Sequence, residues 1–226
     1  MKIVAGDIGK QSDYAVAAVL LGSPRTANAP RAYHVSELDR WRGEKYQHTV
    51  RRLVALAEKH PDALVAVDAG GVGRPVLDLL RDALPGRKVF GIVSTGGRNA
   101  TTGAEPGDLN VPKADLIGAL QVLLQNKRLT YSPGLGLVRE LQSEFQRYEM
   151  RTTKALNLTY EAATGHDDIV SAVAIGCWLG EQAPQPLSDA RVAALVLNEP
   201  EAAPEPTKYP TRLDELANDF PDLFRE

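Results

Sequence analysis

Residues 2–21, KIVAGDIGKQSDYAVAAVLL, decide the fold that we expect for this 226-residue chain. The apolar stretch at residues 2–8 predicts a buried strand that ends at Asp7. A polar turn follows at residues 9–12, and a second apolar run fills residues 14–21. Two apolar runs around a short turn predict a pair of antiparallel strands, with an aspartate at the end of the first.

The rest of the chain continues this sheet and adds helices. We expect a loop at 22–30, a third strand at 31–38, a helix at 46–60, a fourth strand at 63–67 that ends at Asp68, a helix after the glycine-rich turn at 70–73, and a fifth strand at 88–93. Residues 94–112 are rich in Gly, Thr and Asn, which predicts a long, mobile loop. Beyond it we expect helices at 113–126 and 135–148, a short strand or hairpin arm at 156–160, and a buried helix from 168 to about 179.

Three antiparallel strands followed by helix, strand, helix and strand is the element order of an RNase H-like α/β fold. We therefore expect a mixed five-stranded sheet with helices on both faces. A right-handed crossover would place the fourth strand parallel to the first, most simply as its neighbour. Asp7 and Asp68 would then lie at one edge of the sheet, on strands about 5 Å apart.

Composition favours a globular protein inside a reducing compartment. Hydrophobic residues make up 43% and charged residues 24% of the chain. No apolar run approaches the roughly 18 residues that a membrane span needs, and the N-terminus lacks the apolar core of a signal peptide. The single cysteine, Cys177, has no partner for an intramolecular disulfide. We expect a cytoplasmic protein, in the host cytoplasm if the chain is viral, with no membrane partner.

The charge is distributed unevenly and suggests where the folded domain ends. Residues 1–183 form the predicted domain, and residues 184–226 form a predicted Pro/Glu-rich linker and acidic C-terminal tail. Residues 199–226 hold eight acidic and three basic residues, a net charge of −5, so that the overall charge of −3 leaves +2 for the rest. Such a body can bind phosphates locally without binding nucleic acid strongly by charge alone.

Four aspartates are candidate ligands for metal ions. Asp7 and Asp68 follow predicted strands, and Asp167 and Asp168 open the buried helix, whose N-terminal dipole favours ionised carboxylates. Hydrolysis of a phosphodiester by two metal ions needs several carboxylates that converge on ions about 3.5–4 Å apart. Magnesium prefers such oxygen ligands. The four aspartates therefore predict a divalent-cation site at one sheet edge.

Each of these residues also has a simpler interpretation. An aspartate before a glycine turn is common at strand ends, and the turn after Asp68 could instead bind phosphate. Asp167 or Asp168 alone would be explained as a helix N-cap. A second aspartate at the start of the same helix is harder to explain by capping, and four acids at the ends of related elements favour the metal site.

These residues resemble the nuclease domain of phage terminase large subunits. The resemblance covers roughly residues 2–180 and rests on the order of several motifs. They are Gly6-Asp7-Ile8-Gly9 with Asp13-Tyr14-Ala15, the segment Val67 to Gly73, Val111 to Leu116, the Arg139-Glu140-Leu141…Phe145 helix, and Gly165-His166-Asp167-Asp168. It implies an endonuclease that cuts double-stranded DNA during viral genome packaging, with two Mg²⁺ or Mn²⁺ ions.

The resemblance also implies roles for single residues. Asp7 and Asp68 would be metal ligands, with the third carboxylate from the pair Asp167 and Asp168; we favour Asp168 as the direct ligand. Residues in contact with the ligands or the substrate would be Asp13, His166 and Lys113. Contacts to the DNA backbone would come from Arg98, Arg147, Arg151 and Lys154, although the last three could instead form an ordinary solvated face. Possible protein partners are a terminase ATPase, a small terminase subunit and a portal.

One departure from the terminase pattern and three other functions remain to be weighed. No Gly-x-x-x-x-Gly-Lys-[Ser/Thr] loop appears, so we expect an isolated nuclease domain, either excised or a separate gene product. A Holliday-junction-resolvase-like nuclease is the first alternative, but that family usually has Glu where this chain has Asp68. An actin-like kinase would need a second domain, and a non-catalytic interaction protein would not need four acids.

Overall fold

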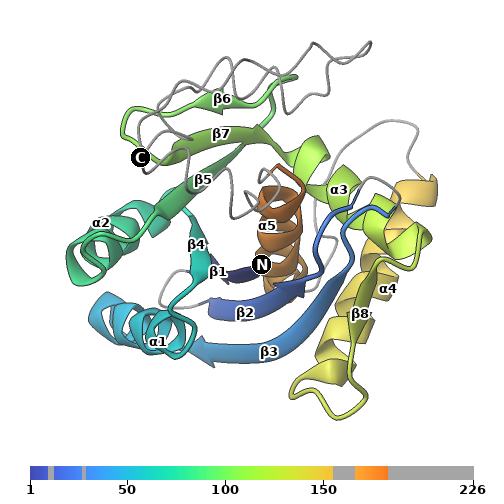
Figure 1. The fold of residues 1–226 in the computed structure, drawn as a ribbon, viewed down its shortest axis with the longest axis horizontal. Helices are drawn as coiled ribbons and strands as arrows, with labels where there is room; N and C mark the ends of the chain where they lie inside the picture. The colour runs from blue at the N-terminus through green and yellow to red at the C-terminus, as the bar shows by residue number, and fades with distance from the viewer. Residues whose placement is uncertain (10–12, 27–28, 155–165, 183–226) are drawn as a thin grey trace.

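The computed structural model describes residues 1–9, 13–26, 29–154 and 166–182, with the backbone alone at 149–154. Its centre is a mixed sheet in the order β6-β7-β5-β4-β1-β2-β3-β8 (Figure 1). The strands are β1 (Lys2–Asp7), β2 (Tyr14–Gly22), β3 (Tyr33–Arg42), β4 (Ala63–Asp68), β5 (Val89–Thr95), β6 (Thr101–Thr102), β7 (Asp108–Pro112) and β8 (Leu129–Tyr131). The helices are α1 (Tyr46–Lys59), α2 (Gly73–Ala83), α3 (Lys113–Gln125), α4 (Val138–Lys154) and α5 (Asp168–Gln182).

The sheet is covered on both faces because its central strands are apolar on both sides. Side chains alternate along a strand, so Ile3 and Ala5 of β1 pack into one core and Val4 into the other. The first core joins the sheet to α3, α4 and α5, and the second joins it to α1 and α2. None of the described helices is long and apolar enough to span a membrane.

The predicted order of the first five strands is confirmed. β1 pairs antiparallel with β2, and β2 pairs antiparallel with β3. The crossover through α1 brings β4 beside β1 in parallel, with Gly6 opposite Val67. The RNase H-like arrangement expected from the sequence is therefore present.

The prediction of a long loop at residues 94–112 is wrong, and the described residues form an eight-stranded sheet where five strands were expected. β7 pairs in parallel with β5, and the short β6 pairs antiparallel with β7. This segment forms a strand because the free edge of β5 offers it hydrogen-bond partners. Leu109 and Val111 are both buried in β7. The buried Asp108 carboxylate also accepts hydrogen bonds from Arg74 and Arg81, at 2.6 and 2.8 Å. Residue composition alone does not reveal such long-range partners.

Other element bounds differ from those predicted. β3 continues to Arg42 rather than ending at residue 38, and β8 was not predicted at all. The helix expected from residue 135 begins at Val138, after Leu137 in a left-handed conformation (φ 61°), and runs to Lys154. The strand or hairpin arm predicted at 156–160 and the tail predicted at 184–226 lie outside the described residues, so the domain boundary stays a prediction.

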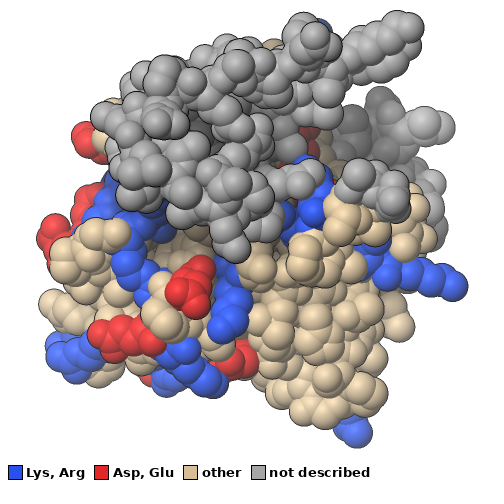
Figure 2. Space-filling view, in the orientation of Figure 1, with Lys and Arg blue, Asp and Glu red and all other residues tan. Residues whose placement is uncertain are grey.

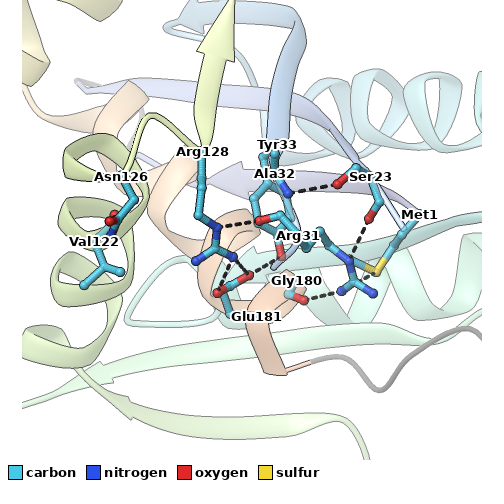
Figure 3. A network of polar contacts seen from close by, with 10 residues as sticks. All are labelled: Met1, Ser23, Arg31, Ala32, Tyr33, Val122, Asn126, Arg128, Gly180 and Glu181. Carbon is cyan, nitrogen blue, oxygen red and sulfur yellow. Dashed lines mark hydrogen bonds and ion pairs between the residues drawn. The ribbon is translucent and has the colours of Figure 1, made fainter. Parts of the chain in front are cut away.

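Helix α5 packs unusually close to the sheet and is anchored at its C-terminal end. A Cβ atom built on Gly180 would lie 2.6 Å from the Tyr33 ring, so only glycine permits this approach. The buried Arg31 guanidinium donates to the Gly180 carbonyl at 2.6 Å, and Arg128 forms an ion pair with Glu181 at 2.8 Å (Figure 3). These contacts fix the end of α5 that is opposite Asp168.

Candidate active site

The acidic residues lie where the carboxyl ends of two parallel strands meet the start of a buried helix. Asp7 is the last residue of β1 and Asp68 the last of β4, one position beyond the paired residues Gly6 and Val67. Asp168 is the first residue of α5, and Asp167 precedes it. The structure therefore brings together the four aspartates that the sequence singled out.

Asp7 lies at the centre of this cluster. Burial raises the pKa of its carboxyl well above the ordinary value, and the neighbouring carboxylates of Asp68, Asp168 and Asp167 raise it further. A hydrogen bond from the Ser171 side chain opposes this shift in the pKa. An ionised Asp7 therefore needs a nearby cation, which would offset both the loss of hydration and the repulsion from the neighbouring carboxylates.

Asp68 lies beside a small cavity. Its Oδ1 accepts a hydrogen bond from the Gly70 amide at 2.7 Å, and burial raises the pKa of its carboxyl, against this bond and the charge of Lys113. The cavity, of about 110 Å³, is lined by polar groups from Asp68, Ser94, Lys113 and Ser171 and by apolar residues of α3 and α5. Lys113 is thus placed near Asp68, as the sequence predicted for a residue at the site.

Asp168 is held from two sides. Its Oδ2 accepts a hydrogen bond from Arg40 Nη2 at 2.9 Å, and the Nδ1 atom of His166 lies 3.6 Å from the same oxygen. Burial raises the pKa of the Asp168 carboxyl, and the positive charge of Arg40 opposes this. The Asp167 carbonyl accepts the Ser171 amide at 2.8 Å, which closes the first turn of α5.

Four residues to which the sequence assigned no role complete the site: Tyr14, Arg40, Glu144, and Ser171, whose side chain forms a hydrogen bond with Asp7. Arg40 lies in the part of β3 beyond the predicted strand end, and its guanidinium stacks 3.9 Å from the centre of the Tyr14 ring. Glu144 is buried, and burial raises the pKa of its carboxyl to about 7. One signal could have found Glu144, because it follows Leu141 by three residues and so lies on the apolar face of its helix.

The other predicted residues lie around the cluster. Asp13 is exposed directly before β2, and the exposed His166 ring makes an edge contact with Tyr14 at 4.8 Å between ring centres. Arg147 is exposed and donates to the His166 carbonyl at 3.4 Å. Arg98 is exposed between β5 and β6. Arg151 and Lys154 belong to α4, but their side chains lie outside the described part of the chain.

The donor set fits divalent cations that prefer oxygen. The site offers carboxylates and a hydroxyl, and burial, together with the neighbouring carboxylates, raises the pKa of Asp7. As the side chains stand, no three His, Cys, Asp or Glu residues within the described ranges close around one point that could hold a metal ion. Two of the carboxylates have an oxygen engaged elsewhere, Asp68 by the Gly70 amide and Asp168 by Arg40. Metal binding would therefore use the other oxygen of each carboxylate and would draw the carboxylates closer together.

A mixed sheet of this order, with aspartates at the ends of β1 and β4 and at the start of α5, defines the RNase H-like class of nuclease folds. The chain belongs to the terminase RNase H-like domain family, whose model matches residues 4–176. No protein of curated function matches the chain.

Solved structures share the fold. The large terminase nuclease from thermophilic phage G20c superposes with a TM-score of 0.51 at 22% identity, over 78% of this chain and 80% of that one. Its forms with bound magnesium and with bound cobalt give TM-scores of 0.53 and 0.52 at the same identity and coverage. At this identity the likeness establishes the fold alone.

Proposed function

We propose that this chain is a metal-dependent endonuclease that cuts double-stranded DNA during viral genome packaging. The observation that carries the proposal is the position of Asp7, a half-buried carboxylate at the end of β1 whose charge is felt by the nearby carboxylates of Asp68, Asp167 and Asp168. A cluster that is so unfavourable without cations is typical of a site that binds them. Membership of the terminase RNase H-like family supports the same function.

We assign the metal-ligand role to Asp7, Asp68 and Asp168, with Asp167 at the same site. Two Mg²⁺ or Mn²⁺ ions held there would supply Lewis-acid stabilisation of the charge that develops on the scissile phosphate. The bound magnesium and cobalt in the phage G20c nuclease are properties of that protein, and they make a divalent ion the natural candidate here.

Basic residues around the cluster would hold the DNA backbone. Lys113 borders the cavity beside Asp68 and can neutralise a phosphate there. Arg98 and Arg147 are exposed, and we propose them, with Arg151 and Lys154 from the C-terminal part of α4, as contacts to the DNA backbone. Figure 2 shows lysines and arginines mixed with acidic residues on the side of α1 and α2, not a patch of one sign. Such a surface favours a nuclease that is brought to DNA by a partner.

The partners that suit this role are a terminase ATPase, a small terminase subunit and a portal, in the cytoplasm of an infected host. The ATPase would supply the translocation for which this chain has no phosphate-binding loop. The nuclease would then cut the duplex that the motor presents to the edge of β1 and β4.

Cleavage of a supercoiled plasmid tests this function. We expect nicked and linear products with Mg²⁺ or Mn²⁺, and none with EDTA. A linear duplex and a four-way junction of the same sequence, compared at equal concentration, separate the proposed activity from the alternative. Symmetrical cleavage of the junction alone would favour a resolvase-like nuclease, and the absence of metal-dependent cleavage of any DNA would contradict the proposal.

A further inference from the structure

The N-terminus of α5 is capped by a side chain from another helix. The Oε2 atom of Glu144 accepts hydrogen bonds from the backbone amides of Ile169 and Val170, at 3.0 and 3.2 Å. These amides belong to the first turn of α5, where backbone N–H groups have no partner within the helix. Glu144 is 2% exposed, so the cap lies inside the protein, directly behind Asp168.

Arg40 connects this cap to the carboxylate of Asp168. Its Nη2 donates to Asp168 Oδ2 at 2.9 Å, while its Nη1 lies 3.5 Å from Glu144 Oε1. The Tyr14 ring packs against the guanidinium, with its centre 3.9 Å from the Arg40 Cζ atom, and restricts its movement. Strand β3, helix α4 and helix α5 thus meet at one arginine.

The arrangement is not optimal for stability. Arg40 Nε and Glu144 Oε1 are buried, and neither has a hydrogen-bond partner among the described residues. Buried polar groups without partners cost free energy, and buried ion pairs often stabilise a protein less than apolar residues of the same volume. The geometry of the pair therefore points to a role in placing the start of α5.

We propose that Arg40 and Glu144 are positioning residues that fix the first turn of α5 and turn the Asp168 carboxylate toward Asp7 and Asp68. Glu144 holds the helix backbone, and Arg40 holds the carboxylate that projects from it. This inference rests on the proposed metal-dependent function of the site, in which neither residue contacts the substrate or a metal ion.

Charge and position predict opposite effects when Arg40 is replaced. If the arginine acted only through its charge, its removal would make the aspartate cluster more negative and Mn²⁺ would bind more tightly. If it positions Asp168, its removal leaves this ligand misplaced and Mn²⁺ binds more weakly. The loss of a group that orients a metal ligand typically costs about 10–100-fold in metal affinity. The direction of the change therefore separates the two roles.

Titration calorimetry with Mn²⁺ on the full chain measures this direction. We expect Arg40→Gln to weaken Mn²⁺ binding by about tenfold or more. Arg42→Gln is the matched control, because it removes the same charge two residues along the strand, where the guanidinium lies farther from Tyr14, at 5.4 Å. Affinity in this control should stay the same or rise. Unchanged or tighter binding by a folded Arg40→Gln variant would overturn the proposal.

Three further variants cover a failure of Arg40→Gln to fold. Arg40→Lys keeps the charge but cannot span both carboxylates, so we expect weaker Mn²⁺ binding; wild-type affinity would again overturn the proposal. Glu144→Gln keeps an oxygen acceptor for the two amides and should bind Mn²⁺ nearly as wild type does, whereas Glu144→Met should not. If the wild-type protein itself bound no Mn²⁺, the proposed function would fail rather than the positioning role.

Discussion

Asp7 and Asp68 end two neighbouring parallel strands in the same register, one residue beyond the pair Gly6 and Val67. Strands 4.7–4.9 Å apart carry their terminal side chains to one edge of a sheet, so this register alone places two carboxylates close together. The start of α5, which packs on one face of the sheet, adds Asp167 and Asp168. The geometry of the site thus follows from the central topology of the fold.

Neutralising either strand-end aspartate should abolish cleavage without unfolding the protein. Asp7→Asn and Asp68→Asn each remove one charged ligand and leave the volume unchanged, and we expect a loss of roughly 100-fold or more in plasmid cleavage. Asp62→Asn is the matched control, because Asp62 is exposed just before β4 begins, at the opposite end of that strand. Wild-type cleavage by either site variant would show that the assignment is wrong.

Metal should stabilise the wild-type protein more than it stabilises Asp7→Asn. Without metal, the variant should melt at the same or a higher temperature at neutral pH, because burial and the neighbouring carboxylates both disfavour the charged form of Asp7 in the wild type. An excess of Mn²⁺ should raise the melting temperature of the wild type by roughly 3 °C or more. Thermal melts with EDTA and with Mn²⁺ measure both effects, and equal metal shifts in the two proteins would count against a shared site.

The positions of the aspartates could be predicted from the sequence, but much of what holds them could not. Apolar runs that end in Asp7 and Asp68 are local signals, and the crossover rule places them side by side. β7 depends on the open edge of β5, which no local pattern encodes. Arg40 and Glu144 come from segments about a hundred residues apart and acquire meaning only through their contacts with α5.

The stability of the protein in EDTA should depend on pH through Glu144. Burial raises the pKa of Glu144 from 4.5 to about 7, so the folded state favours its protonated form. The stability that this provides is complete below the unfolded pKa of 4.5 and is lost as the pH rises through about 7. Glu144→Gln cannot ionise and escapes this loss.

The melting temperature of Glu144→Gln relative to wild type should therefore increase between about pH 5 and pH 8. Melts of both proteins in EDTA across this range provide the measurement. A difference that stays constant with pH would mean that the Glu144 carboxyl titrates alike in the folded and unfolded states.

The acidic C-terminal segment should be dispensable for cleavage. Residues 199–226 carry a net charge of −5, which would repel DNA near the site. A chain that ends near Pro184 should keep metal-dependent cleavage and bind DNA slightly more tightly at low salt. Cleavage and DNA-binding assays of this truncation, with its fold checked by circular dichroism, test the boundary. Loss of activity in a folded truncation would show that the segment completes the active site.

A crystal structure with bound Mn²⁺, located by its anomalous scattering, tests the central claim most directly. We predict manganese at the carboxyl ends of β1 and β4, with carboxylate oxygens of Asp7, Asp68 and Asp168 at about 2.1–2.3 Å from the ion. The Asp68 side chain should shift from the position in which the Gly70 amide holds it, while Asp168 keeps its hydrogen bond to Arg40 and binds the metal through its other oxygen. Manganese bound elsewhere, with none of these aspartates coordinating it at saturating metal, would contradict the account.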